Sequence, residues 1–202
     1  MPELRLKLSP TQLRFFNATA RHVWLISSKG EGKSFSAIAS LFAHVARQDP
    51  DNLPISVGIV RDTHENFQAH TVTSIKRDFP GLFTFKNDYH VMIGPNIVAQ
   101  TYGVNDLEAV NKLQAGGQHD VVWIEEPAPI LDTGNAGIRE EVFFFADAVL
   151  RGGKCTKRLQ ITQNPANRLH WTYKQAIVAP LPDTAVFFMK PGENPYYSQA
   201  DR

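Results

Sequence analysis

The sequence predicts an α/β fold in which a mainly parallel sheet is covered by helices on both faces. Two observations lead to this prediction. Short apolar runs, which are typical of buried strands, alternate along the chain with longer segments of helical periodicity. Strands that alternate with helices form parallel sheets, whose strands are buried on both faces. The chain has 202 residues, 43% of them hydrophobic and 20% charged, so we expect one domain over residues 1–202.

The N-terminal part is predicted to hold a helix, a buried strand and a second helix. Ser9 stands at the N-cap position, Pro10 at the first helical position and Gln12 at the capping-box position, so a helix begins there. The apolar run His22–Ile26 predicts a buried strand, and the periodic stretch Ser34–Ala46 predicts a long helix. The Ser/Gly-rich turn between these two is therefore a strand-to-helix connection.

The rest of the chain continues this alternation with shorter elements. The segment His64–Phe79 is helical in pattern and ends at Pro80-Gly81. A tight turn at Gly94-Pro95-Asn96 allows the short strands on either side of it to pair in antiparallel fashion. The remaining predicted elements are a helix at Glu140–Leu150 and strands at Ile55–Val60, Phe83–Phe85, His90–Ile93, Ile97–Thr101, Val121–Ile124, Arg158–Thr162 and Ala185–Met189.

Composition excludes several classes of protein. No apolar run approaches the roughly 20 residues that span a membrane, and the N-terminus lacks the apolar core of a secretory signal. The single Cys155 forms no internal disulfide, and no Cys/His cluster has zinc spacing. The formal net charge of +1 neither requires nor excludes a nucleic-acid partner. We therefore expect a cytoplasmic protein with no membrane partner.

A glycine-rich loop lies between the first predicted strand and the long helix. It reads Ser27-Ser28-Lys29-Gly30-Glu31-Gly32-Lys33-Ser34. Glycines let backbone N–H groups turn inward around phosphates, and the helix N-terminus adds its positive end. Lys33 would supply a cation for the β- and γ-phosphates, and the Ser34 hydroxyl a ligand for Mg²⁺. Ser27 replaces the first glycine of the usual pattern, so a turn that merely caps the helix is the alternative.

A pair of carboxylates follows the predicted strand Val121–Ile124. Glu125 and Glu126 emerge at the carboxyl edge of the sheet, where open α/β sheets bind ligands. In P-loop ATPases the first acid helps to hold Mg²⁺ and the second polarises the attacking water. Side chains alternate along a strand, so the two acids have different roles. With the loop, they predict a P-loop NTPase of the ASCE/RecA-like type; solvated acids at a strand end are the alternative.

Two further polar segments are candidates for the same site. The amide of Gln12 can pair with an adenine edge, with Phe15 or Phe16 as a stacking ring, whereas a capping role alone is the alternative. Thr162–Pro165 ends a predicted strand, so its polar side chains should lie beside the acids. There they could sense the γ-phosphate, whereas a simple Asn-Pro turn is the alternative.

Other charged and aromatic residues are less specific signals. The basic residues that could stabilise a transition state are Lys29, Arg61, Arg139 and Arg151. A solvated or structural role is the simpler interpretation for each of them. We interpret His22 and His119 as structural, the run Phe143–Phe145 as core, and the basic stretch Lys154–Arg158 as a solvated loop rather than a DNA contact.

Taken in order, these segments resemble the ATPase domain of the large terminase subunit, the motor that packages DNA into tailed bacteriophage heads. The resemblance covers nearly the whole chain. Its motifs, in chain order, are Ser9–Phe16, the loop Ser27–Ser34, Val60–Thr63, Tyr102-Gly103, Lys112–Gly116, the acidic pair, Thr162–Pro165 followed by His170-Trp171, and Glu193–Tyr196, which is similar to the family's Asp-Asn-Pro segment. The motifs are short, but their order and spacing are specific.

The resemblance implies an ATPase that uses ATP and Mg²⁺ to translocate DNA. It implies that Ser34 and Glu125 hold the metal, that Glu126 and Lys33 are catalytic, and that Asn164 couples hydrolysis to movement. The implied nucleotide-binding residues are Gln12, Ser28, Lys29, Gly30, Glu31, Gly32, Lys33, Ser34 and Phe35. The implied partners are double-stranded DNA, the portal protein, the small terminase subunit and further copies of the chain in a ring, all in the host-cell cytoplasm.

The sequence departs from the family pattern in two places. Lys29 stands where the family often has Arg, so an arginine-finger role at that position is not implied. Terminases continue into a nuclease domain, whereas this sequence stops at Arg202 and holds no acid cluster suited to two metals. We therefore expect the family's nuclease domain to be absent from residues 1–202, which are either an ATPase domain separated from its nuclease or a form that lacks the nuclease.

Two other functions stay open at the level of sequence. A helicase or recombinase-like ATPase would need its own motifs, such as a Ser-Ala-Thr segment after the acids, which Thr162–Pro165 does not match. A nucleotide-gated assembly module would bind ATP as a structural switch without turnover. The presence of Glu126 argues against such a module, because a switch has little need of a water-activating acid.

Overall fold

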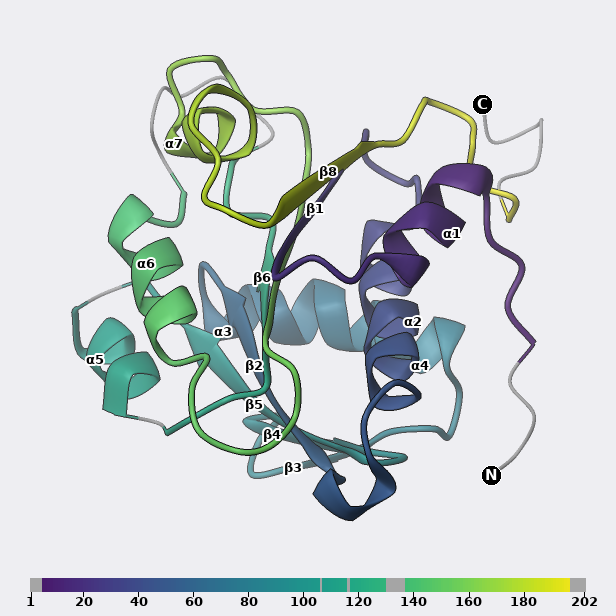
Figure 1. Cartoon of the computed structure of the whole chain (residues 1–202), viewed down its shortest axis with the longest axis vertical. Coiled ribbons are helices and arrows are strands. Elements are labelled where there is room, and N and C mark those ends of the chain that lie inside the picture. Colours follow the sequence, from purple (N-terminus) through teal and green to yellow (C-terminus); the bar gives the residue numbers. More distant parts are fainter. Residues whose placement is uncertain (1–4, 106, 116, 130–136, 197–202) are drawn as a thin grey trace.

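An eight-stranded sheet runs through the centre of the protein in the order β3-β4-β5-β2-β6-β7-β1-β8 (Figure 1). The computed structural model describes residues 5–105, 107–115, 117–129 and 137–196. From β5 to β8 every neighbouring pair of strands is parallel, and β4 alone runs antiparallel to its neighbours β3 and β5. The mainly parallel sheet and the antiparallel pairing at the Gly94–Asn96 turn are both confirmed.

The strand order brings three predicted segments to one edge of the sheet. Because β7 lies between β1 and β6, the loop after β1, the acids at the end of β6 and the polar residues at the end of β7 are neighbours. β1 has its predicted bounds, and the other strands differ from the prediction by one or two residues. The strands are β1 (His22–Ile26), β2 (Ile55–Arg61), β3 (Thr84–Lys86), β4 (Val91–Gly94), β5 (Ile97–Gly103), β6 (Val121–Glu125), β7 (Arg158–Gln163) and β8 (Thr184–Phe188).

The helices include a segment with a π-helical middle. The predicted helix His64–Phe79 consists of α3 (His64–Asn66), the π-helix η2 (Phe67–Val72) and α4 (Thr73–Asp78). The sequence pattern did not predict α5 or the segment α7–η3, because short helices show few turns of periodicity. The remaining helices are α1 (Pro10–Asn17), α2 (Lys33–Val45), the 3-10 helix η1 (Pro50–Asn52), α5 (Leu107–Ala115), α6 (Glu140–Ala148), α7 (Trp171–Tyr173) and the π-helix η3 (Lys174–Val178).

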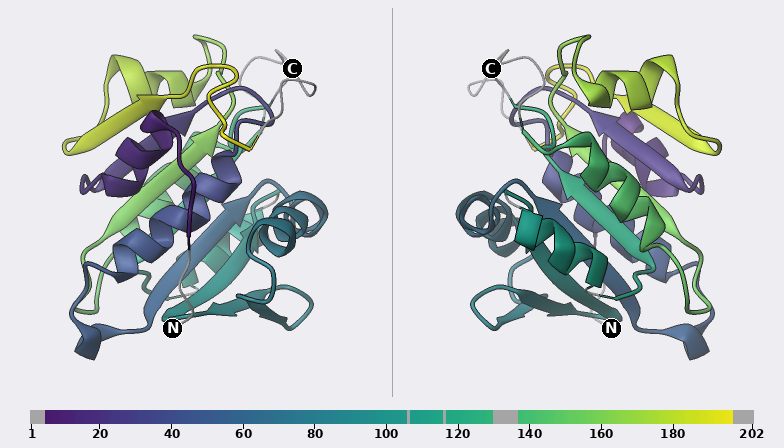
Figure 2. Two further views of the ribbon diagram at one scale, coloured as in Figure 1. Left: turned by 90° about the vertical axis from the view of Figure 1, so that its right-hand side faces the viewer. Right: turned by 90° about the vertical axis from the view of Figure 1, so that its left-hand side faces the viewer.

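Helices cover both faces of the sheet, as predicted. Figure 2 shows α1 and α2 in front of the sheet in one view, and α5 and α6 in front of it in the opposite view. Alternation along β6 divides its side chains between two cores: Val122 and Ile124 pack with Phe143 of α6, and Trp123 packs with Ile38 of α2. Interior strands are apolar on both faces, which is why the sequence shows them as continuous runs.

Several polar residues serve the fold itself. The N-cap of α1 is confirmed, because Ser9 Oγ accepts from Gln12 N at 3.2 Å and Ser9 N donates to Gln12 Oε1 at 2.9 Å. His22 and His119 are buried and hydrogen bonded inside the fold, in line with their structural interpretation. The prediction of a solvated loop was wrong for Arg158, which starts interior strand β7 and donates to two carbonyls at the end of α1.

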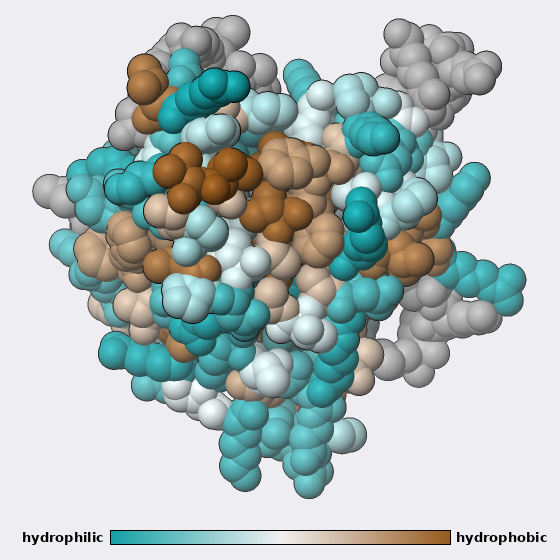
Figure 3. All heavy atoms as spheres, turned by 45° about the horizontal axis from the view of Figure 1, so that its top comes forward, coloured by the Kyte–Doolittle hydropathy of each residue, from teal (hydrophilic) through white to brown (hydrophobic). Residues whose placement is uncertain are grey.

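One face of the molecule carries an apolar patch. Figure 3 looks onto the face that carries α7 and β8, and brown, apolar atoms gather on it. The exposed apolar side chains of η3 and β8 are Ile177, Val178 and Phe188. β8 is an edge strand with β1 as its sheet neighbour, so its side chains are only partly covered.

Phe144 is exposed as well, which limits the predicted aromatic core at Phe143–Phe145, because consecutive residues cannot share one helical face. Within the described residues, no helix has the length and apolar character needed to cross a membrane.

Candidate functional site

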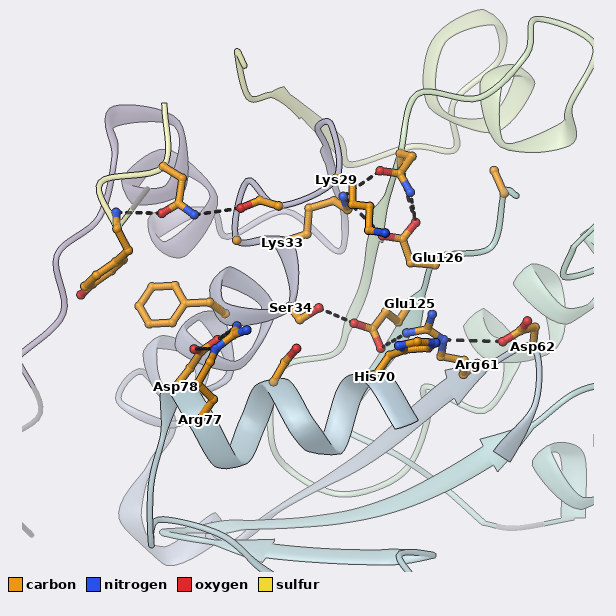
Figure 4. Close-up of a pocket in the computed structure, with 18 of the residues that line it drawn as sticks. Lys29, Lys33, Ser34, Arg61, Asp62, His70, Arg77, Asp78, Glu125 and Glu126 are labelled. Atoms are coloured by element: carbon orange, nitrogen blue, oxygen red, sulfur yellow. Dashed lines mark hydrogen bonds and ion pairs between the residues drawn. The ribbon is translucent and has the colours of Figure 1, made fainter. Parts of the chain in front are cut away.

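A cavity of about 1090 Å³ lies at the edge of the sheet where the predicted site segments meet (Figure 4). The glycine-rich loop Ser27–Ser34, named the phosphate loop after its predicted role, lines it together with the acids Glu125 and Glu126 at the end of β6 and Asn164 after β7. The helical segment His64–Asp78 and the segment Asn194–Tyr196 also contribute to its wall. The lining residues include Arg5, Lys29, Gly30, Gly32, Lys33, Ser34, Phe35, Arg61, Asp62, His70, Ser74, Arg77, Asp78, Glu125, Glu126, Asn164, Asn194 and Tyr196.

Lys33 is the cation at the centre of this cavity. It is the first residue of α2, and the loop before it turns through Gly32 with φ of 80°. Its Nζ donates to the loop carbonyls of Ser27 at 3.2 Å and Ser28 at 3.0 Å, and to Asn164 Oδ1 at 3.0 Å. The same atom lies 3.3 Å from Glu126 Oε1. Lys33 therefore joins the phosphate loop to the side chains that follow β6 and β7.

Glu125 is directed towards the start of α2. Its carboxylate is buried, and Oε1 accepts a hydrogen bond from Ser34 Oγ at 2.5 Å. Oε2 accepts from Arg61 Nη1 at 2.9 Å and from Thr71 Oγ1. Hydroxyl and carboxylate oxygens are the hard ligands that Mg²⁺ prefers, so Ser34 and Glu125 fit a magnesium ion bound with a nucleotide.

Glu126 leaves the strand and faces different partners. Its φ of 51° turns the backbone out of β6, and Oε2 accepts from Asn164 Nδ2 at 2.6 Å and from Asn164 N at 3.2 Å. Burial raises the pKa of the Glu126 carboxyl; Lys33 opposes this rise and the neighbouring Glu125 adds to it. The two adjacent acids thus occupy separate environments: Glu125 contacts Ser34, whereas Glu126 lies beside Lys33 and Asn164.

The side chain of Gln12 serves the capping box and does not line the cavity. It is fully buried, and within the described residues its Nε2 atom has no hydrogen-bond partner. A Cβ placed on Gly32 would come within 3.0 Å of this atom, so Gln12 supports the phosphate loop from beneath. Phe15 is buried against Phe187 and is not free to stack on a base. Phe35, by contrast, lines the cavity and packs against Phe79 and Tyr196.

The chain's last described segment is tied to the phosphate loop. The carboxylate of Glu31 accepts from Gly192 N at 2.7 Å and from Asn194 N at 3.1 Å. Asn194 Nδ2 donates to Gly30 O at 3.0 Å. Glu31 thus binds the backbone of the segment Gly192–Asn194 and does not line the cavity. The sequence pattern did not indicate this contact.

The four basic candidates occupy different positions. Lys29 is exposed and lines the cavity, and Arg61 lines it while bonded to Glu125. Arg139 is the N-cap residue of α6 and lies 3.9 Å from Glu141; neither it nor Arg151 lines the cavity.

Sequence reasoning missed a group of cavity residues on the helical segment His64–Asp78. They are His70, Ser74, Arg77 and Asp78, which line the cavity together with Arg5. Ser74 lies four residues after His70, three before Arg77 and four before Asp78, and residues at such spacings lie on one side of a helix. That spacing was the available signal, and it carried no motif that pointed to a ligand.

Comparisons with known proteins give matches in structure alone. No family model matches the chain, and no curated protein matches its sequence. The large terminase of a thermophilic bacteriophage superposes with a TM-score of 0.68 at 17% identity, covering 96% of this chain and 48% of that one. The large terminase ATPase domain of Thermus phage P74-26 gives a TM-score of 0.56 at 16% identity, covering 90% of this chain and 80% of that one.

A third neighbour agrees with these two. The N-terminal domain of the DNA packaging ATPase from bacteriophage phi29 superposes with a TM-score of 0.60 at 13% identity, covering 93% of this chain and 97% of that domain. This chain therefore spans about half the length of the thermophilic phage terminase and nearly all of the phi29 domain. The chain has the P-loop NTPase fold of the ATPase domains of phage large terminases.

Proposed function

We propose that this chain is the ATP-hydrolysing motor domain of a viral DNA-packaging terminase. The observation that carries the proposal is the position of Lys33, whose Nζ lies 3.0 Å from Asn164 Oδ1 and 3.3 Å from Glu126 Oε1. One cation thus connects the phosphate loop, a carboxylate suited to activate water and a residue suited to couple the reaction to movement. Nucleotide as the ligand is supported by neighbours solved as large terminase complexes with ADP and with ATP-gamma-S.

The phosphate loop and the start of α2 hold the triphosphate in this proposal. Backbone N–H groups from Gly30 to Ser34 face the phosphates, and the N-terminus of α2 adds its positive end. Lys33 exchanges its bonds to Ser27 O and Ser28 O for phosphate oxygens. Mg²⁺, when bound with the nucleotide, would supply positive charge that offsets the charge of the phosphates. Ser34 and Glu125 are the ligands that this chain offers to it.

Glu126 acts as the general base for the attacking water. Its raised pKa makes the carboxylate a better proton acceptor than a solvated Glu. Two hydrogen bonds from Asn164 fix Oε2, so Oε1 remains beside Lys33. Any shift of Lys33 or Glu126 on hydrolysis moves Asn164, and with it the connection from β7 to α7. This connection is how hydrolysis would be coupled to translocation of double-stranded DNA.

Assembly completes the proposed motor. Arg61 is hydrogen bonded to Glu125, and neither Arg139 nor Arg151 lines the cavity of its own chain. A ring of copies would allow a neighbour to supply a basic residue to the transition state. The proposed partners are double-stranded DNA, the portal protein and the small terminase subunit in the host-cell cytoplasm. We also propose that residues 1–202 form one domain.

The function is tested by Mg²⁺-dependent ATP hydrolysis over a wide protein concentration range, with and without double-stranded DNA. Lys33→Ala should abolish both ATP binding and hydrolysis. Glu126→Gln should retain ATP binding, while hydrolysis falls by about 10²- to 10⁴-fold because the general base is lost. Lys174→Ala and Glu141→Gln are matched controls at exposed positions and should behave as wild type.

The outcomes separate the motor from its alternatives. Hydrolysis that rises faster than linearly with concentration and disappears in both site variants supports an oligomeric motor. A wild-type chain that binds ATP but does not hydrolyse it at any concentration contradicts the motor and favours a nucleotide-gated assembly module. Hydrolysis that survives Glu126→Gln contradicts the role of this carboxylate.

A further inference from the structure

The buried face of the helical segment His64–Asp78 contains a single polar residue. Phe67, Thr71, Val72 and Ile75 are its buried members, and Thr71 is fully buried. A valine would fill the same space as Thr71 without a polar atom that needs a partner. The Thr71 hydroxyl has two partners, since it accepts from Arg61 Nη1 at 3.0 Å and donates to Glu125 Oε2. The Thr71 hydroxyl therefore binds the Glu125 carboxylate and adds nothing to the packing of the apolar core.

Thr71 lies within the π-helical turn η2. Phe67, Thr71, Ile75 and Phe79 recur every four residues and are all buried. In a regular α-helix the first and last of these would be rotated by about 120° from one another. The wider turns of η2 reduce this rotation, and π-helical turns occur frequently at functional sites. Thr71 is on the side of this segment that faces β2 and β6, because it contacts Arg61 of β2 and Glu125 of β6.

The two oxygens of Glu125 have different partners. Oε2 accepts hydrogen bonds from Arg61 and Thr71. Oε1 accepts one from Ser34, and Figure 4 shows Glu125 between Ser34 and Arg61. We infer that Thr71 is a positioning residue: together with Arg61 it fixes Glu125 so that Oε1 faces Ser34 as a ligand for the Mg²⁺ of a bound nucleotide. This inference rests on the proposed function, because it requires a Mg–nucleotide in the cavity. Residues that orient a metal ligand in this way typically influence metal affinity by 10- to 100-fold.

The inference also assigns a role to Arg61. Its guanidinium lies between Glu125 and Thr71, and its Nε is 3.5 Å from Asp62 Oδ1. A side chain bonded in this way orients the metal carboxylate and is not free to approach the γ-phosphate. Arg61 is therefore a second positioning residue rather than an arginine finger.

The experiment measures Mg²⁺ affinity without turnover. Calorimetric titration of Mg²⁺ into protein saturated with ADP gives the affinity directly, and the melting temperature without ligand reports on folding. Thr71→Val removes the hydroxyl and keeps the shape, and Thr71→Ala removes it together with a methyl group. Thr71→Ser retains the hydroxyl. Thr73→Val, at an exposed position of the same helical segment, is the matched control.

We expect Thr71→Val and Thr71→Ala to weaken Mg²⁺ binding by about tenfold or more, with ADP affinity in EDTA changed by less than about twofold. Thr71→Ser should remain within about threefold of wild type, and Thr73→Val should be unchanged. Equal Mg²⁺ affinity in wild type and both hydroxyl-free variants would overturn the inference and leave the proposed function standing. A wild-type chain that binds neither ADP nor ATP would overturn the proposed function and this inference with it.

Discussion

At the scale of single residues, burial decides how the ionisable groups of this protein behave. Glu125 and Glu126 are adjacent in sequence, yet the first is bonded to Ser34 and the second to Asn164. Burial raises the pKa of Glu126, which suits proton acceptance. The same physical effect acts in the opposite direction on a buried base, because burial always disfavours the charged form.

His44 provides a test of that effect. It is buried in α2, its Nε2 lies 3.0 Å from Thr156 O, and burial followed by the charge of Arg158 lowers its pKa from 6.5 to about 4. The unfolded chain therefore takes up the proton first. Stability from neutral His44 is present above pH 6.5 and is lost as the pH falls towards 4, by at most about 3 kcal/mol.

The measurement is the free energy of unfolding in urea between pH 4 and pH 8 for wild type and His44→Gln. The difference between the two should be constant above pH 7 and should shift against the wild type as the pH falls. Parallel curves for the two proteins over the whole range would contradict the lowered pKa of His44.

At the scale of elements, the phosphate loop depends on the backbone that connects β1 to α2. Gly32 has φ of 80°, and a Cβ there would stand 3.0 Å from Gln12 Nε2 and 3.4 Å from Asn194 Nδ2. Both neighbours are buried, so they have little room to move. The loop is thus shaped by a residue that can adopt a left-handed conformation and by close packing from α1 and the last described segment.

Gly32→Ala should lower the free energy of unfolding by about 1–3 kcal/mol, because it combines a strained backbone with these close contacts. It should also abolish nucleotide binding. Gly81→Ala is the matched control, since Gly81 has φ of 71° and a Cβ there would meet nothing within 4 Å. Thermal and urea unfolding check the prediction, and an equal loss in the two variants would show that the contacts around Gly32 have no effect.

At the scale of the whole molecule, the site joins segments from the two ends of the chain. Glu31 accepts hydrogen bonds from the backbone of Gly192 and Asn194, which are 161 and 163 residues away in sequence. Glu193 in turn accepts from Thr11 N at 3.0 Å. The phosphate loop, the start of α1 and the segment after β8 therefore form one connected unit.

Glu31→Gln should weaken this unit. Its amide retains one acceptor oxygen and sets an NH₂ group against a backbone N–H, and a lost hydrogen bond to a charged group costs about 1.5–3 kcal/mol. The free energy of unfolding in urea, together with the rate of proteolysis in the segment after β8, measures the effect. Glu141→Gln, at an exposed position, should leave both unchanged. If Glu31→Gln kept the wild-type free energy of unfolding and rate of proteolysis, the Glu31 hydrogen bonds would not stabilise this unit.

The sequence by itself determined the layered fold and indicated three of the segments that meet at the cavity. Buried parallel strands are continuous apolar runs, and capping residues mark the start of α1, so local composition was enough to place these elements. The loop that contains Lys33, the two acids and Asn164 each stand at the end of a predicted strand. Because parallel strands present their carboxyl ends at one edge of the sheet, the sequence predicted that these three segments meet there.

Only the tertiary structure decided what each of these side chains contacts. The strand order put β7 between β1 and β6, so Asn164 meets both Lys33 and Glu126. The packing of the helical segment His64–Asp78 brought Thr71 to Glu125, and no local sequence pattern marks this contact in advance. Gln12, which the sequence allowed either at a base or in a cap, is engaged in the cap. Contacts of this kind depend on where distant segments pack, and the free energy of that packing is a property of the whole fold rather than of any short stretch of sequence.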